Sequence, residues 1–518
     1  MPKDTAEQPT EPLSLCKTFL VSGIRKLAGQ TLWYGLPSVA SRFLGYLMNL
    51  SLPLIFKEPA ITADLTLIYA TVAFLNIIYT YGLETAYFRF SATEDRDRLY
   101  GTLSVALLVS SFLFSALLWS LQDQLAQWGR LGSHTEYIRW MIGILWVDSL
   151  STLAFAKLRQ ENRPRRYALA KMVSVLVNII VVIVFLGIVP RYLATHPSAL
   201  LGSLYATDET GIVWFLIGNF FGSLLSLLLL TNEWISVRFY FDASLFKKVM
   251  RYAWPLVLVG MGGIANDMLS RLLYQFMVDL PPEEAKHQLG VFGNIVRLSI
   301  VITIAIQAFR MAAEPFFFHR SQADDAPRTY ARVMNYFVIV CCFLFLGLSL
   351  YIDLIKWFFE AIDRVRWTEG LYVVPLIAMA NIFLGIYYNL SIWYKLTNHT
   401  LTGAYITIGG TLITLLLTTT LIPSLGYLGA ALASFCCYSF MMMSSYWLGQ
   451  KHYPVPYPVK KILFYLLLSA SLYGAHRWLI TLIEHPALNL ALATVLLAVF
   501  AYVVQQKEQF RWAAFKKA

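Results

Sequence analysis

The sequence predicts an all-α polytopic membrane protein. Of its 518 residues, 58% are hydrophobic and 14% are charged, whereas soluble domains are roughly 45–50% apolar and about 25% charged. The mean hydropathy is +0.59. Apolar runs of about 20 residues, the length that crosses a bilayer as a helix, recur along the whole chain. Backbone groups in lipid must be satisfied within the segment, so these runs are predicted to be helices.

The apolar runs are separated by short polar segments such as "RFSATEDRDR" and "KLRQENRPRR". Each run is long enough to span the hydrocarbon core. The fourteen predicted transmembrane helices cover residues 31–56, 61–88, 100–121, 137–157, 167–189, 211–231, 251–278, 289–315, 331–353, 371–394, 401–422, 425–448, 460–480 and 487–505.

The distribution of Lys and Arg predicts the orientation. Roughly 28 of the 41 basic residues fall on the even-numbered side of the spans, and basic loops face the cytoplasm. Both termini are therefore predicted to be cytoplasmic, and an even number of spans agrees with this because it places both ends on the same side. The first 30 residues lack the apolar core and cleavage site of a signal peptide, so they are predicted to remain as a cytoplasmic segment.

Three stretches of the first half recur in the same order in the second half. "SRFLGYLM" from Ser41 resembles "SRLLYQFM" from Ser270, "ETAYFRFS" resembles "EPFFFHRS", and "KLRQENRPRRYA" resembles "KLTNHTLTGAYI". Six spans separate equivalent elements, which predicts parallel repeats about an axis along the membrane normal. The predicted division is a segment 1–30, an N-lobe 31–238, a C-lobe 239–450, and a terminal helix pair with a cytoplasmic tail 451–518.

Charged side chains inside the spans are the candidate site residues. A charge at the bilayer centre costs at least about 2.5–3.5 kcal/mol, so it normally faces a cavity or a partner. Arginine presents a planar fork of donors that suits phosphate. The candidates for binding an anionic substrate in a central cavity are Arg42, Asn49, Arg271, Asn294, Arg297 and Arg310. The candidates for ion pairing or coupling are Glu84, Asp148, Asp267 and Glu314.

Ion pairing within the membrane is the alternative interpretation of these charges. Asp267 with Arg271 and Arg310 with Glu314 have the four-residue spacing that allows a pair within one helix. Arg42 is expected to reach toward Glu84 on the neighbouring span, and Arg89 is expected to anchor the cytoplasmic end. Glu84 and Glu314 are expected to be a symmetric pair that binds the arginine of its own lobe or a coupling cation. For Asp148, a helix-packing role and a site role remain open.

Other classes of function fit the sequence less well. The net charge of +11 lies in short loops between apolar spans, so no continuous basic patch for nucleic acid is expected. The five cysteines have no metal-binding spacing. No HExxH, GxSxG or Walker A pattern is present, and the outer loops near 122–136 and 190–210 are short. A membrane enzyme is therefore disfavoured, and no cofactor is expected.

Four stretches carry a family resemblance: "LAGQTLWYGLPSVASRFLGYLMN", "YGLETAYFRFS", "DSLSTLAFAKLRQENRPRRYALAKM" and "IPSLGYLGAALAS". Over residues 25–505 the chain resembles bacterial polysaccharide flippases of the Wzx type, which belong to the MOP superfamily with lipid II flippases and MATE exporters. The resemblance implies two six-helix lobes that meet in a V, cavity arginines that bind pyrophosphate or an acidic sugar, and a terminal pair that forms a groove for the lipid tail. In contrast to many MATE exporters, the first span offers Arg42 and no acidic residue.

The expected function is translocation of an undecaprenyl-pyrophosphate-linked oligosaccharide from the inner to the outer leaflet of the bacterial cytoplasmic membrane by alternating access. A MATE-like cation-coupled multidrug antiporter and a lipid II flippase are the alternatives. The expected driving force for translocation is the membrane potential or a gradient of H⁺ or Na⁺. The expected partners are the lipid-linked glycan, membrane lipids and glycan-assembly enzymes, with no nucleic acid, and the resemblance favours a monomer.

Overall fold

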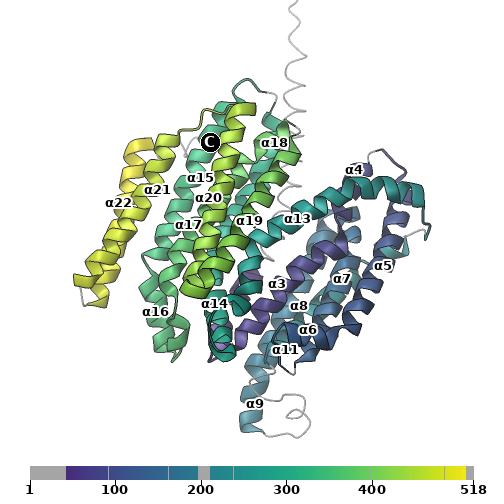
Figure 1. Cartoon of the computed structure of the whole chain (residues 1–518), viewed down its shortest axis with the longest axis horizontal. Helices are drawn as coiled ribbons and strands as arrows, with labels where there is room; N and C mark the ends of the chain where they lie inside the picture. Colours follow the sequence, from purple (N-terminus) through teal and green to yellow (C-terminus); the bar gives the residue numbers. More distant parts are fainter. Residues whose placement is uncertain are drawn as a thin grey trace, which may run out of the picture.

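The computed structural model describes residues 43–508, apart from residues 92, 133, 162, 197–210, 237–238, 322, 398 and 483–484. Over these residues the chain is helical and contains no strand. Figure 1 shows two helical lobes that meet near α3 and α14 and diverge toward the ends that carry α4 and α18. The prediction of an all-α membrane protein is confirmed.

The N-lobe begins after a short apolar helix over Phe43–Ile55. Its helices are α2 (Leu52–Ile55), α3 (Ile61–Thr80), α4 (Leu83–Phe90), α5 (Arg96–Ser120), α6 (Gln122–Trp128), α7 (Thr135–Gln160), α8 (Pro164–Val182), η1 (Ile183–Ile188), α9 (Val189–Thr195), α11 (Gly211–Leu229) and α12 (Thr231–Ile235).

The long helix α13 (Ala243–Met277) connects the lobes. The C-lobe and the terminal pair comprise α14 (Pro282–Arg320), α15 (Ala326–Ser349), α16 (Ile352–Ala361), η3 (Val365–Thr368), η4 (Leu371–Val373), α17 (Val374–Leu390), α18 (Ile392–Leu396), α19 (Thr400–Leu425), α20 (Tyr427–His452), α21 (Val459–Leu479), η5 (Ile480–Leu482) and α22 (Pro486–Glu508).

Twelve helices within the described residues are long and apolar enough to cross a membrane. The predicted span 31–56 lies partly outside the described residues, which show its second half as a short helix. The predicted span 460–480 is present as α21 but is not among the twelve, and Lys460, Lys461 and Arg477 reduce its apolar length. The chain is therefore a multi-pass membrane protein, and the predicted count of fourteen spans is not confirmed.

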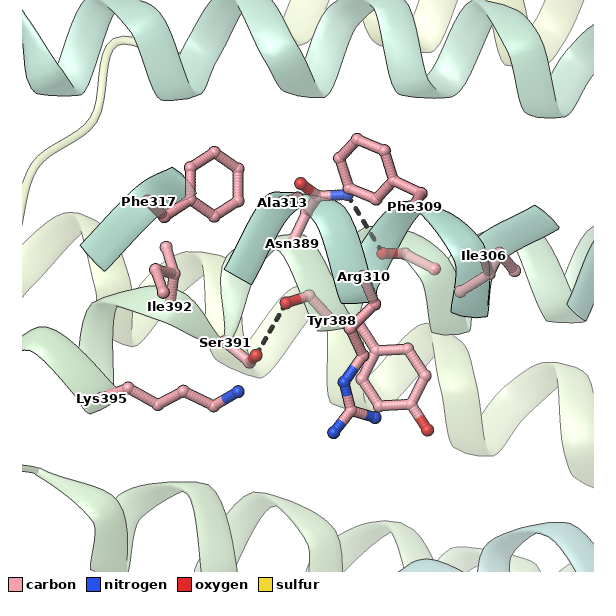
Figure 2. Close-up of a pocket in the computed structure, with 11 residues that line it drawn as sticks. Ile306, Phe309, Arg310, Ala313, Phe317, Tyr388, Asn389, Ser391, Ile392 and Lys395 are labelled. Carbon is pink, nitrogen blue, oxygen red and sulfur yellow. Dashed lines mark hydrogen bonds between the residues drawn. The ribbon is translucent and has the colours of Figure 1, made fainter. Parts of the chain in front are cut away.

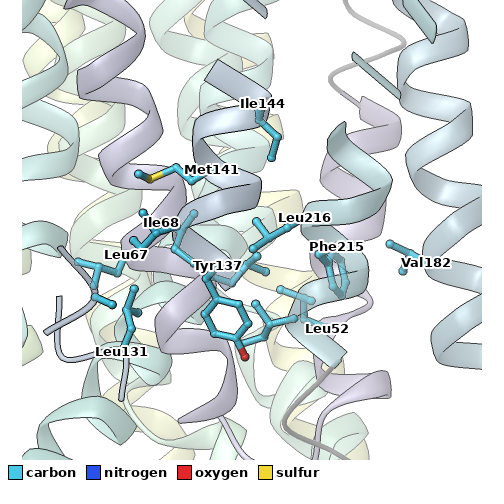
Figure 3. Close-up of a cluster of buried hydrophobic side chains, with 14 of the residues drawn as sticks. Leu52, Leu67, Ile68, Leu131, Tyr137, Met141, Ile144, Val182, Phe215 and Leu216 are labelled. Atoms are coloured by element: carbon cyan, nitrogen blue, oxygen red, sulfur yellow. The ribbon is translucent and has the colours of Figure 1, made fainter. Parts of the chain in front are cut away.

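Each lobe has its own apolar core. In the N-lobe, Ile68, Tyr137 and Phe215 are buried together where α3, α7 and α11 meet (Figure 3). In the C-lobe, the core of α15 and α17 extends to Tyr465 and Phe500, which attach the terminal pair α21–α22 to the outer side of α15. Large apolar side chains on the outward faces remain exposed in the isolated chain, as expected for a surface that faces lipid.

The predicted second span, 61–88, is two helices. Tyr81 and Gly82 both adopt left-handed backbone angles, with φ of 31° and 75°, so α3 ends and α4 begins in a new direction. A Cβ on Gly82 would lie 3.3 Å from the carbonyl oxygen of Ala253 in α13. Glycine at position 82 tolerates both its own positive φ and the close approach of Ala253. The break between α3 and α4 lets α4 pack against the first half of α13.

Candidate functional site

Arg297 on α14 lies between the lobes. Its Nη2 donates a hydrogen bond of 2.9 Å to the Thr66 hydroxyl of α3, which belongs to the opposite lobe. Its Nη1 is buried and has no hydrogen-bond partner among the described residues. Gly293, one turn earlier, lets the helices approach, because a Cβ there would lie 2.6 Å from the Thr66 hydroxyl. The interface therefore contains a buried cationic donor that is only partly satisfied.

Arg271 on α13 adds a second guanidinium group near the first. Its Nη2 donates to the Asp267 carboxylate at 2.8 Å and to the Asp267 carbonyl oxygen at 3.1 Å. The expected pairing of Asp267 with Arg271 within one helix is thus present. The charge of Arg271 also acts on Arg297 across the gap between α13 and α14. The two arginines and the one carboxylate leave a net positive charge at this position.

Arg310 lies further along α14. Its guanidinium carbon is 4.8 Å from the centre of the Tyr388 ring. Arg310 and Lys395 line a small cavity of about 20 Å³ between α14, α17 and α18, and Figure 2 shows the Lys395 side chain extending toward Arg310. This space admits about one water molecule. The pair therefore adds positive charge to the C-lobe and does not enclose a ligand in this conformation.

The other predicted binding residues are placed differently. Arg42 lies outside the described residues. Asn49 donates to the Gly45 carbonyl oxygen of its own helix at 2.8 Å. Asn294 is 2% exposed and donates to the Trp367 carbonyl oxygen at 3.2 Å, so it positions η3 in this conformation. The Glu314 side chain also lies outside the described residues, which leaves its pairing with Arg310 a prediction.

Glu84 and Asp148 are not at the lobe interface. Both line a cavity of about 280 Å³ inside the N-lobe. Glu84 forms an ion pair with Arg159 of α7. The Ser223 hydroxyl and the Lys171 ammonium both lie close enough to Asp148 to act on its carboxylate.

Arg159 and Lys171 also line this cavity, and neither is among the site residues predicted from the sequence. Lys171 lies within the predicted span 167–189, so the rule that flagged the other intramembrane charges also applies to it. Arg159 belongs to the basic segment "KLRQENRPRR", where the sequence alone gives no sign that one arginine turns back into the lobe. The described residues hold no group of three or more His, Cys, Asp or Glu that could bind a metal ion.

Direct contacts between the lobes close one end of this interface. Lys286 of α14 forms a 2.7 Å ion pair with Asp64 of α3. Arg366 pairs with Glu58 at 2.8 Å, and the Trp367 indole donates to the Lys57 carbonyl oxygen at 3.1 Å. All of these contacts lie at the end where the helix over Phe43–Ile55 turns into α3. Arg297 is therefore located on the inner side of a closed contact between the lobes.

The described residues form a multi-pass membrane fold of two lobes joined at one end, with cationic side chains between them. No protein-family model and no curated protein matches the sequence. Among solved structures, the lipid II flippase MurJ in an inward closed conformation has a TM-score of 0.67 at 14% identity, and the match covers 92% of this chain and 99% of MurJ.

Two MATE structures have the same architecture. An inward-facing multidrug resistance MATE family transporter of the MOP superfamily has a TM-score of 0.58 at 12% identity, covering 82% of this chain and 94% of the transporter. The MATE multidrug transporter DinF-BH, solved with a bound ligand, has a TM-score of 0.58 at 13% identity, covering 82% of this chain and 96% of the transporter. The fold is therefore MOP/MATE-like, and the three solved neighbours described here are one flippase and two transporters.

Proposed function

We propose that this chain is a flippase that moves an undecaprenyl-pyrophosphate-linked oligosaccharide from the inner to the outer leaflet of a bacterial cytoplasmic membrane. The observation that carries the proposal is the buried Nη1 of Arg297, which has no hydrogen-bond partner among the described residues. A buried donor on a charged group is costly to leave unpaired. A ligand oxygen that accepts from this group removes that cost.

Phosphate is the chemical group that best fits these arginines. A pyrophosphate offers several anionic oxygens to guanidinium forks, which bind phosphate through paired charge-assisted hydrogen bonds. The single carboxylate of Asp267 is already paired with Arg271. An organic cation would meet two guanidinium groups here, so the local charge disfavours a cationic drug.

The position of the contacts between the lobes supports alternating access. In the proposed orientation, the end closed by Lys286 and Asp64 faces the outer leaflet, and the head group enters from the side where the lobes diverge. Binding of phosphate to Arg297 competes with its bond to Thr66, which loosens one of the contacts between the lobes. An inside-negative potential favours outward movement of negative charge by about 2.3 kcal/mol per charge per 100 mV.

The length of the match supports a lipid substrate over a drug. The MurJ match covers 92% of this chain, and both MATE matches cover 82%. The difference is comparable in length to the terminal pair α21–α22, which packs on α15. In the proposed function this pair contacts the polyprenyl tail. Lipid II is the second candidate substrate, because the neighbour with the broadest coverage among those described above is a lipid II flippase.

The test is transbilayer movement of fluorescent undecaprenyl pyrophosphate in proteoliposomes, measured as dithionite protection. We expect Arg297→Met to slow movement at least tenfold and Arg297→Lys, which keeps the charge but not the fork, to have an intermediate effect. Arg332→Met, a charge loss at an exposed position of α15, is the matched control and should leave the rate unchanged.

The same vesicles distinguish the alternatives. Movement of a fluorescent organic cation without movement of undecaprenyl pyrophosphate would show that the chain is a MATE-like antiporter. Movement of lipid II in preference to other undecaprenyl-linked glycans would assign the second candidate substrate. Equal rates for the wild type and Arg297→Met would remove the proposed role of the lobe interface.

A further inference from the structure

The cavity inside the N-lobe is a second polar space, separate from the lobe interface that contains Arg271 and Arg297. Its volume is about 280 Å³. Its walls come from α3, α4, α7, α8 and α11, and seven of its twelve lining side chains are uncharged and carry a hydroxyl or an amide: Asn76, Ser151, Thr152, Tyr167, Ser174, Ser223 and Ser226. Polar walls of this extent inside an apolar lobe are costly unless something polar fills the space.

The cavity is too large to be filled by a proton or a bare metal ion alone. A water molecule needs about 10–15 Å³ of such space, so the cavity would hold on the order of twenty waters or one organic group. Small-molecule sites begin at about 300 Å³, so this cavity, at about 280 Å³, lies just below the lower end of that range.

The charges of the lining are balanced. Glu84 and Asp148 are acidic, and Arg159 and Lys171 are basic. Glu84 pairs with Arg159, and the Lys171 ammonium lies 4.2 Å from the centre of the Phe155 ring. The lobe interface, in contrast, carries excess positive charge. The cavity therefore favours a neutral or zwitterionic group, whereas the interface favours phosphate.

The remaining features of the lining suit a sugar. The rings of Phe155 and Tyr167 form an edge-to-face pair with centroids 5.2 Å apart, and such rings pack against the C–H faces of pyranoses. Carboxylates, ammonium and guanidinium groups, and hydroxyls supply both donors and acceptors for sugar hydroxyls.

The cavity reaches the surface of the N-lobe on the side that faces α13. Asn76 on α3 is exposed, and the Glu84 side chain on α4 is 41% exposed. The neighbouring Ile77 contacts the position of Gly260 on α13, where a Cβ would lie 3.5 Å away. The cavity therefore opens beside α13, and the inference requires the sugar to enter it at Asn76 and Glu84.

We infer that the N-lobe cavity is the recognition site for a sugar residue of the lipid-linked glycan, with Asp148, Lys171 and Ser223 as specificity-determining contacts. This inference rests on the proposed function, because it assigns the sugar of the same substrate whose pyrophosphate binds between the lobes. It divides recognition between an anion site at the interface and a neutral sugar site inside one lobe.

The test compares two lipids on the purified full-length chain in nanodiscs. One is sugar-free undecaprenyl pyrophosphate, and the other is the undecaprenyl-pyrophosphate-linked glycan fraction extracted from the protein's native cells. We expect the wild type to bind the glycan lipid at least tenfold more tightly, as measured by native mass spectrometry. Ser223→Phe, which fills the cavity, should reduce this ratio to about one. Leu228→Phe, at an exposed position of the same helix, should leave the ratio unchanged.

Milder variants keep the test valid if Ser223→Phe does not fold. Asp148→Asn keeps the shape of the side chain and Ser226→Ala removes one hydroxyl, and each should lower the ratio. A wild-type preference that all three variants retain would place the sugar elsewhere and overturn the inference. Equal binding of both lipids by the wild type would overturn it while leaving the proposed function intact. Binding of neither lipid would remove the proposed function itself.

Discussion

At the scale of single residues, Asp242 fixes the start of α13. Its carboxylate accepts hydrogen bonds from the backbone amides of Ser244 and Leu245 and from the Ser244 hydroxyl. It also forms an ion pair with Arg98 of α5. One side chain thus caps the helix that connects the lobes and attaches it to the N-lobe.

The pH dependence of stability reports on this residue. The hydrogen bond from the Ser244 hydroxyl, followed by that from the Leu245 amide, lowers the pKa of Asp242 from 3.8 to about 2, and Arg98 adds to the effect. A lowered pKa means that the stabilisation is complete above the unfolded-state pKa and is lost as the pH falls through about 2. We expect Asp242→Ala to lower the melting temperature at pH 7, and we expect the difference from wild type to shrink between about pH 4 and pH 2.

Thermal unfolding in detergent, measured from pH 7 to pH 2, gives the difference in melting temperature between Asp242→Ala and the wild type. Asp324→Ala, at an exposed position before α15, is the control and should match the wild type at neutral pH. A difference between Asp242→Ala and wild type that is constant from pH 7 to pH 2 would contradict the assignment.

At the scale of elements, α8 and α11 pack with almost no space between their backbones. A Cβ on Gly222 would lie 2.3 Å from the Ser174 carbonyl oxygen, and one on Gly218 would lie 2.6 Å from the Asn178 amide oxygen. Small residues let transmembrane helices approach in this way. The same contact holds Ser174 and Ser223 in the wall of the N-lobe cavity.

Adding one methyl group at this contact should destabilise the N-lobe. We expect Gly222→Ala to cost about 1–3 kcal/mol, because overpacking a closely packed contact forces the backbones apart. Gly187→Ala is the matched control, since nothing lies within 4 Å of its Cβ position and alanine favours a helix. Thermal unfolding of both variants measures the effect, and equal melting temperatures would show that α8 and α11 separate freely.

At the scale of the whole molecule, the contact between Lys286 and Asp64 holds the two lobes together at one end. Asp64 is 5% exposed, so its carboxylate is paired in a buried setting. Removing one partner of such a pair leaves an uncompensated charge. We expect Asp64→Asn to shift the population toward conformations in which this end is open.

Spin labels at Trp128 of α6 and Trp357 of α16, both exposed, report on the separation of the lobes. Double electron–electron resonance should show a longer distance in Asp64→Asn than in the wild type. Glu360→Gln removes an exposed pair within one helix, where Lys356 and Glu360 are 3.8 Å apart, and should leave the distances unchanged. Identical distance distributions in all three proteins would show that the ion pair does not hold the lobes.

The sequence predicted what depends on local pattern. Apolar run length determines where helices form, so the helical class and most spans were correct. The break at Tyr81 was missed, because Gly82 resembles any glycine in an apolar run until Ala253 is packed against it. Placement of Glu84 and Asp148 also depends on tertiary packing, which turns both toward a cavity inside one lobe. Spacing along the chain does not specify which side of a buried helix meets which neighbour.

The first half of α13 packs on the N-lobe through Leu245, Val249 and Ala253, and its second half bonds to the C-lobe, with Ser270 3.0 Å from Thr418. One continuous helix therefore packs against both lobes. Any motion of one lobe relative to the other must bend α13 between these two contacts. Pro255 lies in this stretch and lacks the amide needed for a helical hydrogen bond. The stiffness of α13 around Pro255 therefore limits how far the lobes can move relative to each other before one of these contacts breaks.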